Sequence, residues 1–410
     1  MKSFLPAASL LFLFLFLFLI LNAQYKNDNK LFRTIYWDEL CDALQKQDGH
    51  LVLDVRSKGE YEDTSSDLNF NLGRIKGAMN IDIRDVSGHL GNIQTYKDKP
   101  VYVYCSHSQR SRRVSKMLAD SGFRQVININ GGMTMLNNMK YAGLNCQQSL
   151  YETKNAYQLI SPIELCSRIN DKELFILDIR RDSAFEGISS REQDNAYGKI
   201  NSAIHIPLST LKNGALNIPA DKTVVIVDDQ GRESPEAAKF LLGKGYKKLA
   251  ILFGGIENFA STNPAELSCK NQVLIGKNAY QLMTDEEFNQ MATQNSDLLI
   301  LDARTSAEFK NESKDYWRNI GQLKNAVNIP SQDIEKRYTE IESYKHKPII
   351  LYGFSGSPEP FYSARFLADH GFAKVFVLMG GIFHLRWAAA NAKNHESLNN
   401  WVVNVPADNL

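Results

Sequence analysis

Cys105 stands at the end of a short apolar run, Val101–Tyr104, and a loop rich in basic and hydroxyl side chains follows it. The β-branched and aromatic run predicts a buried strand, and Val114, Met117 and Leu118 then follow at helical spacing. In a strand, loop and helix of this kind, the N–H groups of the loop and the positive end of the helix converge on the first loop residue. We therefore expect Cys105 to be a nucleophilic thiolate.

The same loop predicts what the cysteine carries. Arg110 is placed to stabilise an anion next to the sulfur, and His107 lies nearby in the sequence. A cradle of loop amides suits an anionic group transferred onto the sulfur, which points to persulfide, phosphate or arsenate chemistry. The alternative interpretation is a buried, inert cysteine at a strand end.

Length and charge limit the classes of protein. A chain of 410 residues is too long for one ordinary domain, and two to four domains are expected. The net charge is +1, and charges of both signs are mixed throughout without a basic tail or stripe. Nucleic acid is therefore not an expected partner.

The N-terminus predicts export. Lys2 precedes the apolar run Leu10–Leu21, and Ala23 follows where a signal peptide would be cut. We expect residues 1–23 to be a signal peptide, which places the mature protein in the periplasm or outside the cell. The alternative is an uncleaved anchor, because the apolar stretch approaches the ~20 residues that span a bilayer.

Five cysteines in an exported protein leave at least one unpaired. Cys41 and Cys166 each follow a Glu-Leu pair, and Cys146 and Cys269 each precede a Lys-Asn-Ala-Tyr-Gln-Leu segment. We interpret each pair as two copies of one repeat position, with a Cys146–Cys269 disulfide as the alternative. The cysteine left over is Cys105.

The chain repeats itself three times. A Leu-Asp-x-Arg motif occurs at 53–56, 177–180 and 301–304, so its aspartates are 124 residues apart both times. A Gly-Gly turn follows at 131–132, 254–255 and 380–381. A period of this length is a whole domain with its own core.

We predict domains at 30–145, 153–268 and 276–395. Within each copy, short strands rich in Val, Ile and Leu alternate with helical segments, which indicates an α/β fold with a parallel sheet covered on both faces. The site is expected at the carboxyl ends of the strands, where Cys105 lies.

Together these motifs resemble the rhodanese-like (sulfurtransferase) family: the Asp-x-Arg strand end, the Gly-x-Ile-x-x-Ala-x-x-Ile segment, the Cys-x-x-x-x-Arg-Ser loop and the Gly-Gly turn. The resemblance implies three tandem domains, each a five-stranded parallel sheet flanked by helices. It also implies that Cys105 carries sulfur as a persulfide and that Arg110 assists it. The substrate-binding residues would be those of the loop, namely Ser106, His107, Ser108, Gln109 and Ser111.

The resemblance assigns further roles. Asp54 and Arg56 would orient the loop from the neighbouring strand end, unless they form a plain strand-end cap and ion pair, whereas Glu60 would be structural. The loop from Cys105 through Arg110 has six residues, the length that the family associates with sulfur transfer rather than with phosphatases. The sequence departs from the family pattern in two ways: the loop has no glycine, and Arg74 stands where histidine is frequent.

Copies two and three lack the cysteine. Aligned by their apolar residues, Asp228 takes the cysteine position and Glu233 that of Arg110, so the second loop is expected to repel an anion. In the third copy the loop is one residue longer, and Gly353 or Phe354 takes the cysteine position. Both copies are predicted to be inactive.

The sequence thus predicts an exported sulfurtransferase with one active domain. The expected substrates are a small sulfur-donor anion, such as thiosulfate or a polysulfide, and a thiol acceptor. The reaction requires neither a metal nor an organic cofactor, and the inactive copies would serve as scaffold or as a surface for a protein partner. The alternatives are a non-catalytic binding or assembly protein, and a phosphatase or arsenate reductase that uses the same loop.

Overall fold

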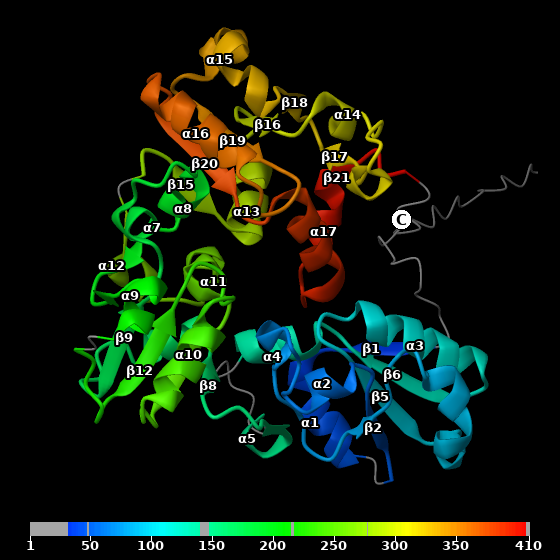
Figure 1. Cartoon of the computed structure of the whole chain (residues 1–410). Helices are drawn as coiled ribbons and strands as arrows, with labels where there is room; N and C mark the ends of the chain where they lie inside the picture. The colour runs from blue at the N-terminus through cyan, green and yellow to red at the C-terminus, as the bar shows by residue number, and fades with distance from the viewer. Residues whose placement is uncertain (1–31, 47–48, 140–146, 215–216, 277, 407–410) are drawn as a thin grey trace, which may run out of the picture.

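The computed structural model of the chain describes residues 32–46, 49–139, 147–214, 217–276 and 278–406 (Figure 1). They form three domains, coloured blue to cyan, green, and yellow to red along the chain. Each contains a five-stranded parallel sheet with flanking helices, as the resemblance implied. The predicted export segment, residues 1–23, lies outside the described residues. Among the residues that are described, no helix is both long and apolar enough to cross a bilayer.

The first domain orders its sheet as β1-β6-β5-β2-β4. Its strands are β1 (Arg33–Ile35), β2 (Leu51–Asp54), β4 (Met79–Asn80), β5 (Pro100–Tyr104) and β6 (Gln125–Ile129). Its helical segments are α1 (Trp37–Lys46), α2 (Lys58–Tyr61), η1 (Leu68–Phe70), η2 (Val86–Tyr96), α3 (Gln109–Asp120), α4 (Gly132–Met139) and α5 (Gln147–Leu150). Side chains alternate along β5, so Val101 and Val103 pack beneath α3, while Tyr102 and Tyr104 face α1 and α4.

The second domain repeats this plan, in the order β11-β9-β12-β13-β8. Its strands are β8 (Gln158–Ile160), β9 (Leu174–Asp178), β11 (Ile204–His205), β12 (Thr223–Val227) and β13 (Leu249–Leu252). Its helices are α6 (Pro162–Ser167), α7 (Asp182–Glu186), α8 (Glu192–Ala196), α9 (Leu208–Asn213), α10 (Ser234–Gly243), α11 (Gly255–Ser261) and α12 (Lys270–Val273).

The third domain has the order β15-β20-β19-β16-β18. Its strands are β15 (Gln281–Met283), β16 (Leu299–Asp302), β18 (Val327–Asn328), β19 (Pro348–Tyr352) and β20 (Lys374–Leu378). Its α-helices are α13 (Asp285–Gln294), α14 (Ser306–Phe309), α15 (Ile334–Arg337), α16 (Glu359–Asp369) and α17 (Gly381–Asn391). Its 3-10 helices are η3 (Tyr316–Arg318), η4 (Ser331–Asp333), η5 (Tyr338–Tyr344) and η6 (Glu396–Trp401).

A short antiparallel strand pair closes each domain, and the chain beyond the last helix supplies one of its strands. The pairs are β3 (Arg74–Ile75) with β7 (Tyr151–Glu152), β10 (Lys199–Ile200) with β14 (Leu274–Ile275), and β17 (Gln322–Leu323) with β21 (Val402–Val403). The boundaries expected at 145, 268 and 395 leave these late strands outside their domains. Strands of two residues are too short to show a hydrophobic period.

A disulfide joins Cys166 of α6 to Cys269, directly before α12, with the two Cα atoms 5.7 Å apart. The alternative Cys146–Cys269 pairing is therefore wrong, because Cys269 is already bonded to Cys166 within the second domain. Cys146 itself lies outside the described residues. Among the described cysteines Cys105 is free, as expected, and Cys41 is disulfide-bonded.

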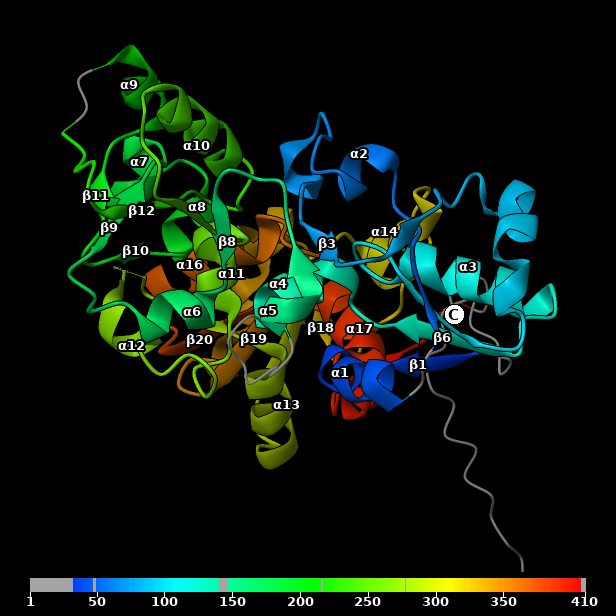
Figure 2. The same cartoon turned by 90° about the horizontal axis from the view of Figure 1, so that it is seen from below.

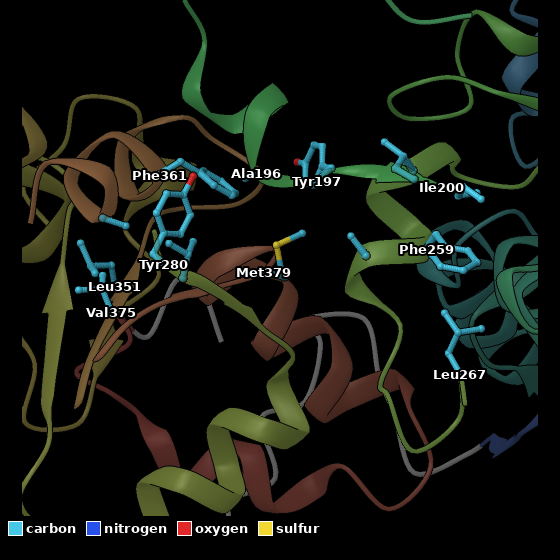
Figure 3. Close-up of a cluster of buried hydrophobic side chains, with 14 of the residues drawn as sticks. Ala196, Tyr197, Ile200, Phe259, Leu267, Tyr280, Leu351, Phe361, Val375 and Met379 are labelled. Carbon is cyan, nitrogen blue, oxygen red and sulfur yellow. The ribbon is translucent and has the colours of Figure 1, made fainter. Parts of the chain in front are cut away.

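The domains are packed against one another. One buried apolar cluster runs from the second domain into the third, where the rings of Tyr197 and Phe361 meet edge to face with centroids 6.2 Å apart (Figure 3). Asn258 donates a hydrogen bond to Asn138 across the first and second domains. Viewed from below, α4, α11 and α17 come together near the centre of the molecule (Figure 2).

Candidate active site

Cys105 directly follows β5, and its side chain belongs to the apolar cluster on the α3 side of the sheet. The residue is almost completely buried, with 1% of its surface exposed. Four residues later α3 begins, so the first N–H groups of this helix lie in the turn next to the cysteine. These groups have no acceptor within the helix and are available to an anion.

Ser108 gives the loop its shape. Its φ angle is +82°, a left-handed conformation that side chains other than glycine seldom adopt. The Ser108 hydroxyl donates to Asn130 Oδ1 at 2.9 Å and accepts a hydrogen bond from the N–H of Gly131. Ser111, also buried, donates to Asn128 Oδ1 at 2.7 Å. These bonds explain how a loop without glycine keeps the turn.

The Gly-Gly motif supports the loop from behind. The carbonyl oxygens of Cys105 and Ser106 accept hydrogen bonds from Met133 N and Thr134 N at 2.9 and 3.0 Å. A Cβ atom on Gly132 would lie 2.3 Å from the Cys105 carbonyl oxygen, so no larger residue fits there. The motif therefore fixes the loop backbone to the start of α4.

Arg110 is bound by a carboxylate. Its two terminal guanidinium nitrogens each donate to a different oxygen of Glu60 at 2.7 Å, and one of them also donates to Ser106 Oγ at 2.8 Å. Glu60 in turn forms a capping box with Ser57 at the start of α2. Burial opposes ionisation of Glu60, but the hydrogen bonds from Arg110 and Ser57 outweigh it and hold the Glu60 pKa below its usual value.

His107 and Gln109, predicted to bind substrate, are exposed at the loop surface. The His107 ring lies between two hydroxyl groups, with Nδ1 2.9 Å from Ser106 Oγ and Nε2 3.0 Å from Thr134 Oγ1. Desolvation by the surrounding protein, and then the charge of Arg110, lower the pKa of His107. The imidazole is therefore neutral at pH 7.

Asp54 and Arg56 form a fully buried ion pair, with Arg56 Nη2 2.7 Å from Asp54 Oδ2 and 2.8 Å from the Gly73 carbonyl oxygen. The second and third domains contain the same arrangement, Arg180 with Asp178 and Arg304 with Asp302. Since the pair recurs without the cysteine, it serves the fold of each domain. This agrees with the ion-pair interpretation. Arg74, the other departure from the family pattern, binds Glu152 of β7 at 2.6 Å.

The corresponding loop of the second domain binds an anion, the carboxylate of Asp228. Asp228 has the position of Cys105, because Ile256 N donates to the Asp228 carbonyl as Met133 N does to that of Cys105. The buried Asp228 carboxylate accepts hydrogen bonds from the backbone N–H groups of Gly231, Glu233 and Ser234. Burial raises the pKa of Asp228, and these donors oppose the rise. The anion cradle is thus present and is filled by the protein's own carboxylate.

In the third domain the position of Cys105 belongs to Gly353, since Ile382 N donates to its carbonyl oxygen. This decides between the two residues that the sequence left open. Pro358 and Pro360 lie at the start of α16, where a backbone N–H is missing.

Sequence reasoning understated three residues of this site. Glu60 was assigned a purely structural role, yet it binds Arg110, while Asn130 and Thr134 contact Ser108 and His107. Asn130 and Thr134 lie on either side of the Gly-Gly motif. The motif therefore predicts that they lie near the loop, but it does not predict which side chains they contact.

Comparison with known proteins matches the sequence model of the rhodanese-like domain to residues 37–138, 161–262 and 284–387. The chain is 31% identical over 110 residues to the uncharacterized protein YqhL of Bacillus subtilis, covering 27% of this chain and 76% of that protein. It is 24% identical over 115 residues to thiosulfate sulfurtransferase GlpE of Coxiella burnetii, covering 28% and 98%. A solved thiosulfate sulfurtransferase from Pseudomonas aeruginosa shares 16% identity over 85% of this chain and 66% of that chain, with a TM-score of 0.21.

Proposed function

The chain belongs to the rhodanese-like family, and on that basis we propose that it is a sulfurtransferase in which Cys105 carries sulfur as a persulfide. The observation that supports this most directly is the Asp228 carboxylate in the second domain, which three backbone N–H groups hold at the position of the cysteine. The equivalent donors in the first domain are the N–H groups of Ser108, Arg110 and Ser111. There the anion at the centre of the cradle is the thiolate or the persulfide of Cys105.

The reaction proceeds in two displacements. The Cys105 thiolate attacks the outer sulfur of thiosulfate, the sulfur–sulfur bond breaks, and sulfite leaves with the bonding electron pair. The terminal sulfur of the new persulfide is anionic and is stabilised by the loop N–H groups and the start of α3. A thiolate acceptor then attacks this sulfur and regenerates the Cys105 thiolate.

Arg110 supports this site by position as much as by charge. Its contacts with Glu60 and Ser106 hold the guanidinium beside the loop, and the Glu60 carboxylate balances its charge. The loop amides therefore provide the main stabilisation of the anion. We assign the second and third domains, with Asp228 and Gly353 in place of the cysteine, a scaffolding or partner-binding role.

The intact mass of the purified full-length chain after incubation with thiosulfate tests the proposal. We expect a gain of one sulfur atom that a thiol such as dithiothreitol removes, and no gain in the Cys105→Ser chain. Absence of a sulfur adduct on the native chain would favour the non-catalytic binding protein. Hydrolysis of a phosphate ester without sulfur uptake would favour the phosphatase.

We also propose that the protein is exported. The apolar N-terminal segment supports this, and the Cys166–Cys269 disulfide is typical of oxidising compartments outside the cytosol. N-terminal sequencing of the mature protein from its native source tests it. Cleavage after Ala23 is expected, and an intact N-terminus in the membrane fraction would instead identify an anchor.

A further inference from the structure

A second group of reactive side chains lies away from Cys105. Asp285 and Glu286 open α13, and His395 precedes η6, so the three residues come from two separate elements of the third domain. Their potential ligand atoms all lie within 4.8 Å of one another. His395 Nε2 is 2.5 Å from Glu286 Oε1, and only 8% of the Asp285 side chain is exposed.

Two further groups face this cluster. His384, on α17, places Nδ1 3.9 Å from Asp285 Oδ2. Glu266 of the second domain lies close enough for its charge to interact unfavourably with that of Glu286. The cluster therefore collects three carboxyl groups and two imidazoles at the contact between two domains.

The cluster lines a cavity of about 570 Å³ where the three domains meet. The first domain contributes residues of α1 and α4, the second residues of α6 and α11, and the third residues of α13 and α17. An ion can therefore enter the site from the cavity.

The cluster holds one more carboxyl group than it holds imidazoles. His395 is paired with Glu286, but the carboxyl groups of Asp285 and Glu266 remain beside it. The ammonium group of Lys270, whose charge acts on Glu286, donates to the carbonyl oxygen of Thr262 at 2.8 Å, and that of Lys393 pairs with Asp38. Close carboxyl groups in a partly buried site repel one another when both are ionised, and either a shared proton or a bound cation relieves the repulsion.

We propose that Asp285, Glu286 and His395 bind a divalent transition-metal ion, with His384 in reach as a fourth ligand. Carboxylate oxygen and imidazole nitrogen together suit Zn²⁺ and its neighbours, whereas Ca²⁺ and Mg²⁺ prefer oxygen ligands alone. In a tetrahedral Zn²⁺ site the ligand atoms are about 3.3 Å apart, so the present spacing requires only small side-chain shifts.

The ion would be structural rather than catalytic. Between α17 and His395, Lys393 pairs with Asp38 of the first domain at 2.5 Å. At the end of α17, the Asn391 carbonyl oxygen accepts a hydrogen bond from Asn130 of the Cys105 loop support. A metal at His395 would therefore fix the segment that connects the third domain to the first.

Zinc titration of the full-length, untagged Cys105→Ser chain tests the proposal, since the free thiol is itself a strong zinc ligand. We expect one Zn²⁺ per chain and binding of Ca²⁺ that is far weaker. His395→Ala and Glu286→Gln should each weaken Zn²⁺ binding by at least about tenfold, because even residues that only orient a ligand contribute 10- to 100-fold. His346→Ala, an exposed histidine of the same domain, is the matched control and should bind as before.

Melting temperatures without zinc show whether each variant is folded, and added zinc should raise them only where the site is intact. X-ray absorption at the zinc edge gives a readout that needs no ligand variant, and imidazole and carboxylate ligation is expected. Equal zinc affinity in His395→Ala and His346→Ala would overturn the proposal. So would equal binding of Ca²⁺ and Zn²⁺, or zinc bound without imidazole.

Discussion

Arg110 and Glu60 meet in a two-point ion pair, with each terminal nitrogen of the guanidinium 2.7 Å from a different carboxylate oxygen. The pair connects the Cys105 loop to the start of α2. In the second domain both partners are replaced, by Glu233 and Ala184 at the equivalent positions. In the third, the corresponding Glu308 binds Arg318, which comes from η3 rather than from the loop. An arginine at the sixth position of the loop, where it can pair with this glutamate, thus accompanies the cysteine of the first domain and is replaced by Glu233 in the second.

Arg110→Met should lower the free energy of unfolding by about 1–3 kcal/mol, because the Glu60 carboxylate, 8% exposed, loses its counter-charge. The double variant Arg110→Met/Glu60→Gln should recover most of this loss, since no buried charge then remains. Both variants should load sulfur more slowly than the native chain in a single turnover, because both lack the guanidinium group beside the loop. Denaturant titration and stopped-flow loading measure the two effects, and a double variant no more stable than Arg110→Met would contradict the account.

The ion pair also predicts a dependence on pH. The pKa of Glu60 in the folded protein lies below its ordinary value of 4.5, so the unfolded state binds the proton first as the pH falls. The contribution of Glu60 to stability is therefore complete above about pH 5 and is lost as the pH falls below 4.5 through the folded pKa. Unfolding free energies of the native chain and Glu60→Gln should differ by a constant amount from pH 5 to 7. The difference should shrink toward pH 3, and one that grows on acidification would contradict the assignment.

Cys105→Ser should abolish sulfur loading, because the equivalent positions of the other domains hold Asp228 and Gly353. Cys269→Ser is the matched control. It removes the disulfide with Cys166 and should cost about 2–5 kcal/mol of stability, yet sulfur loading at 25 °C should stay near that of the native chain. Turnover by the Cys105→Ser chain would show that another thiol carries the sulfur.

Two substitutions of Ser108 separate backbone strain from hydrogen bonding. Ser108→Ala keeps a side chain at φ +82° and loses the bonds to Asn130 and Gly131, so a loss of about 1–3 kcal/mol is expected. Ser108→Gly loses the same bonds but relieves about 1 kcal/mol of strain, and should be the more stable of the two. Gly231, at φ +80° in the second domain, shows that glycine fits this turn. Thermal melts of both variants decide the order.

The filled cradle of the second domain suggests that its chemistry can be restored. In a Cys105→Ser background, the double variant Asp228→Cys/Glu233→Arg should accept sulfur from thiosulfate, because the three N–H donors are already in place. Asp228→Cys alone should load at least about tenfold more slowly, since Glu233 repels the donor anion. Intact mass against time gives both rates. No loading by either variant would mean that the cradle needs further residues of the first domain.

The sequence was sufficient for the three domains and for the place of Cys105, because both depend on local signals: alternating apolar strands, a period of 124 residues and a polar loop at a strand end. It was insufficient for the partners of the loop. The bond from Ser108 to Asn130 and the pair of Arg110 with Glu60 join residues that are 22 and 50 positions apart. Contacts between residues so far apart in the chain leave no periodic pattern in the sequence, so they could not be predicted from it.

The disulfide and the second-domain loop show a different limit. Cys166 and Cys41 occupy matching repeat positions, and this similarity concealed that the bridge of Cys166 lies within its own domain. From the negative charge of Asp228, the sequence predicted that this loop repels an anion. The structure shows instead a carboxylate that satisfies the amides of an intact cradle, and this depends on where three N–H groups point.

Each domain needs its late strand, β7, β14 or β21, to be complete, and this limits which segments of the chain can be duplicated as a unit. Because the chain leading out of each domain completes it, a gene duplication has to include that connecting segment. Lys-Asn-Ala-Tyr-Gln-Leu recurs at 154–159 and 277–282, one residue after β7 and β14, and runs into β8 and β15. This recurrence indicates that the connection between two domains was copied together with the domain. Chimaeras between related chains should therefore be joined after the late strand and before this segment. A junction before β7 or β14 would separate a domain from its own last strand, and one after the segment would cut β8 or β15, the first strand of the next domain.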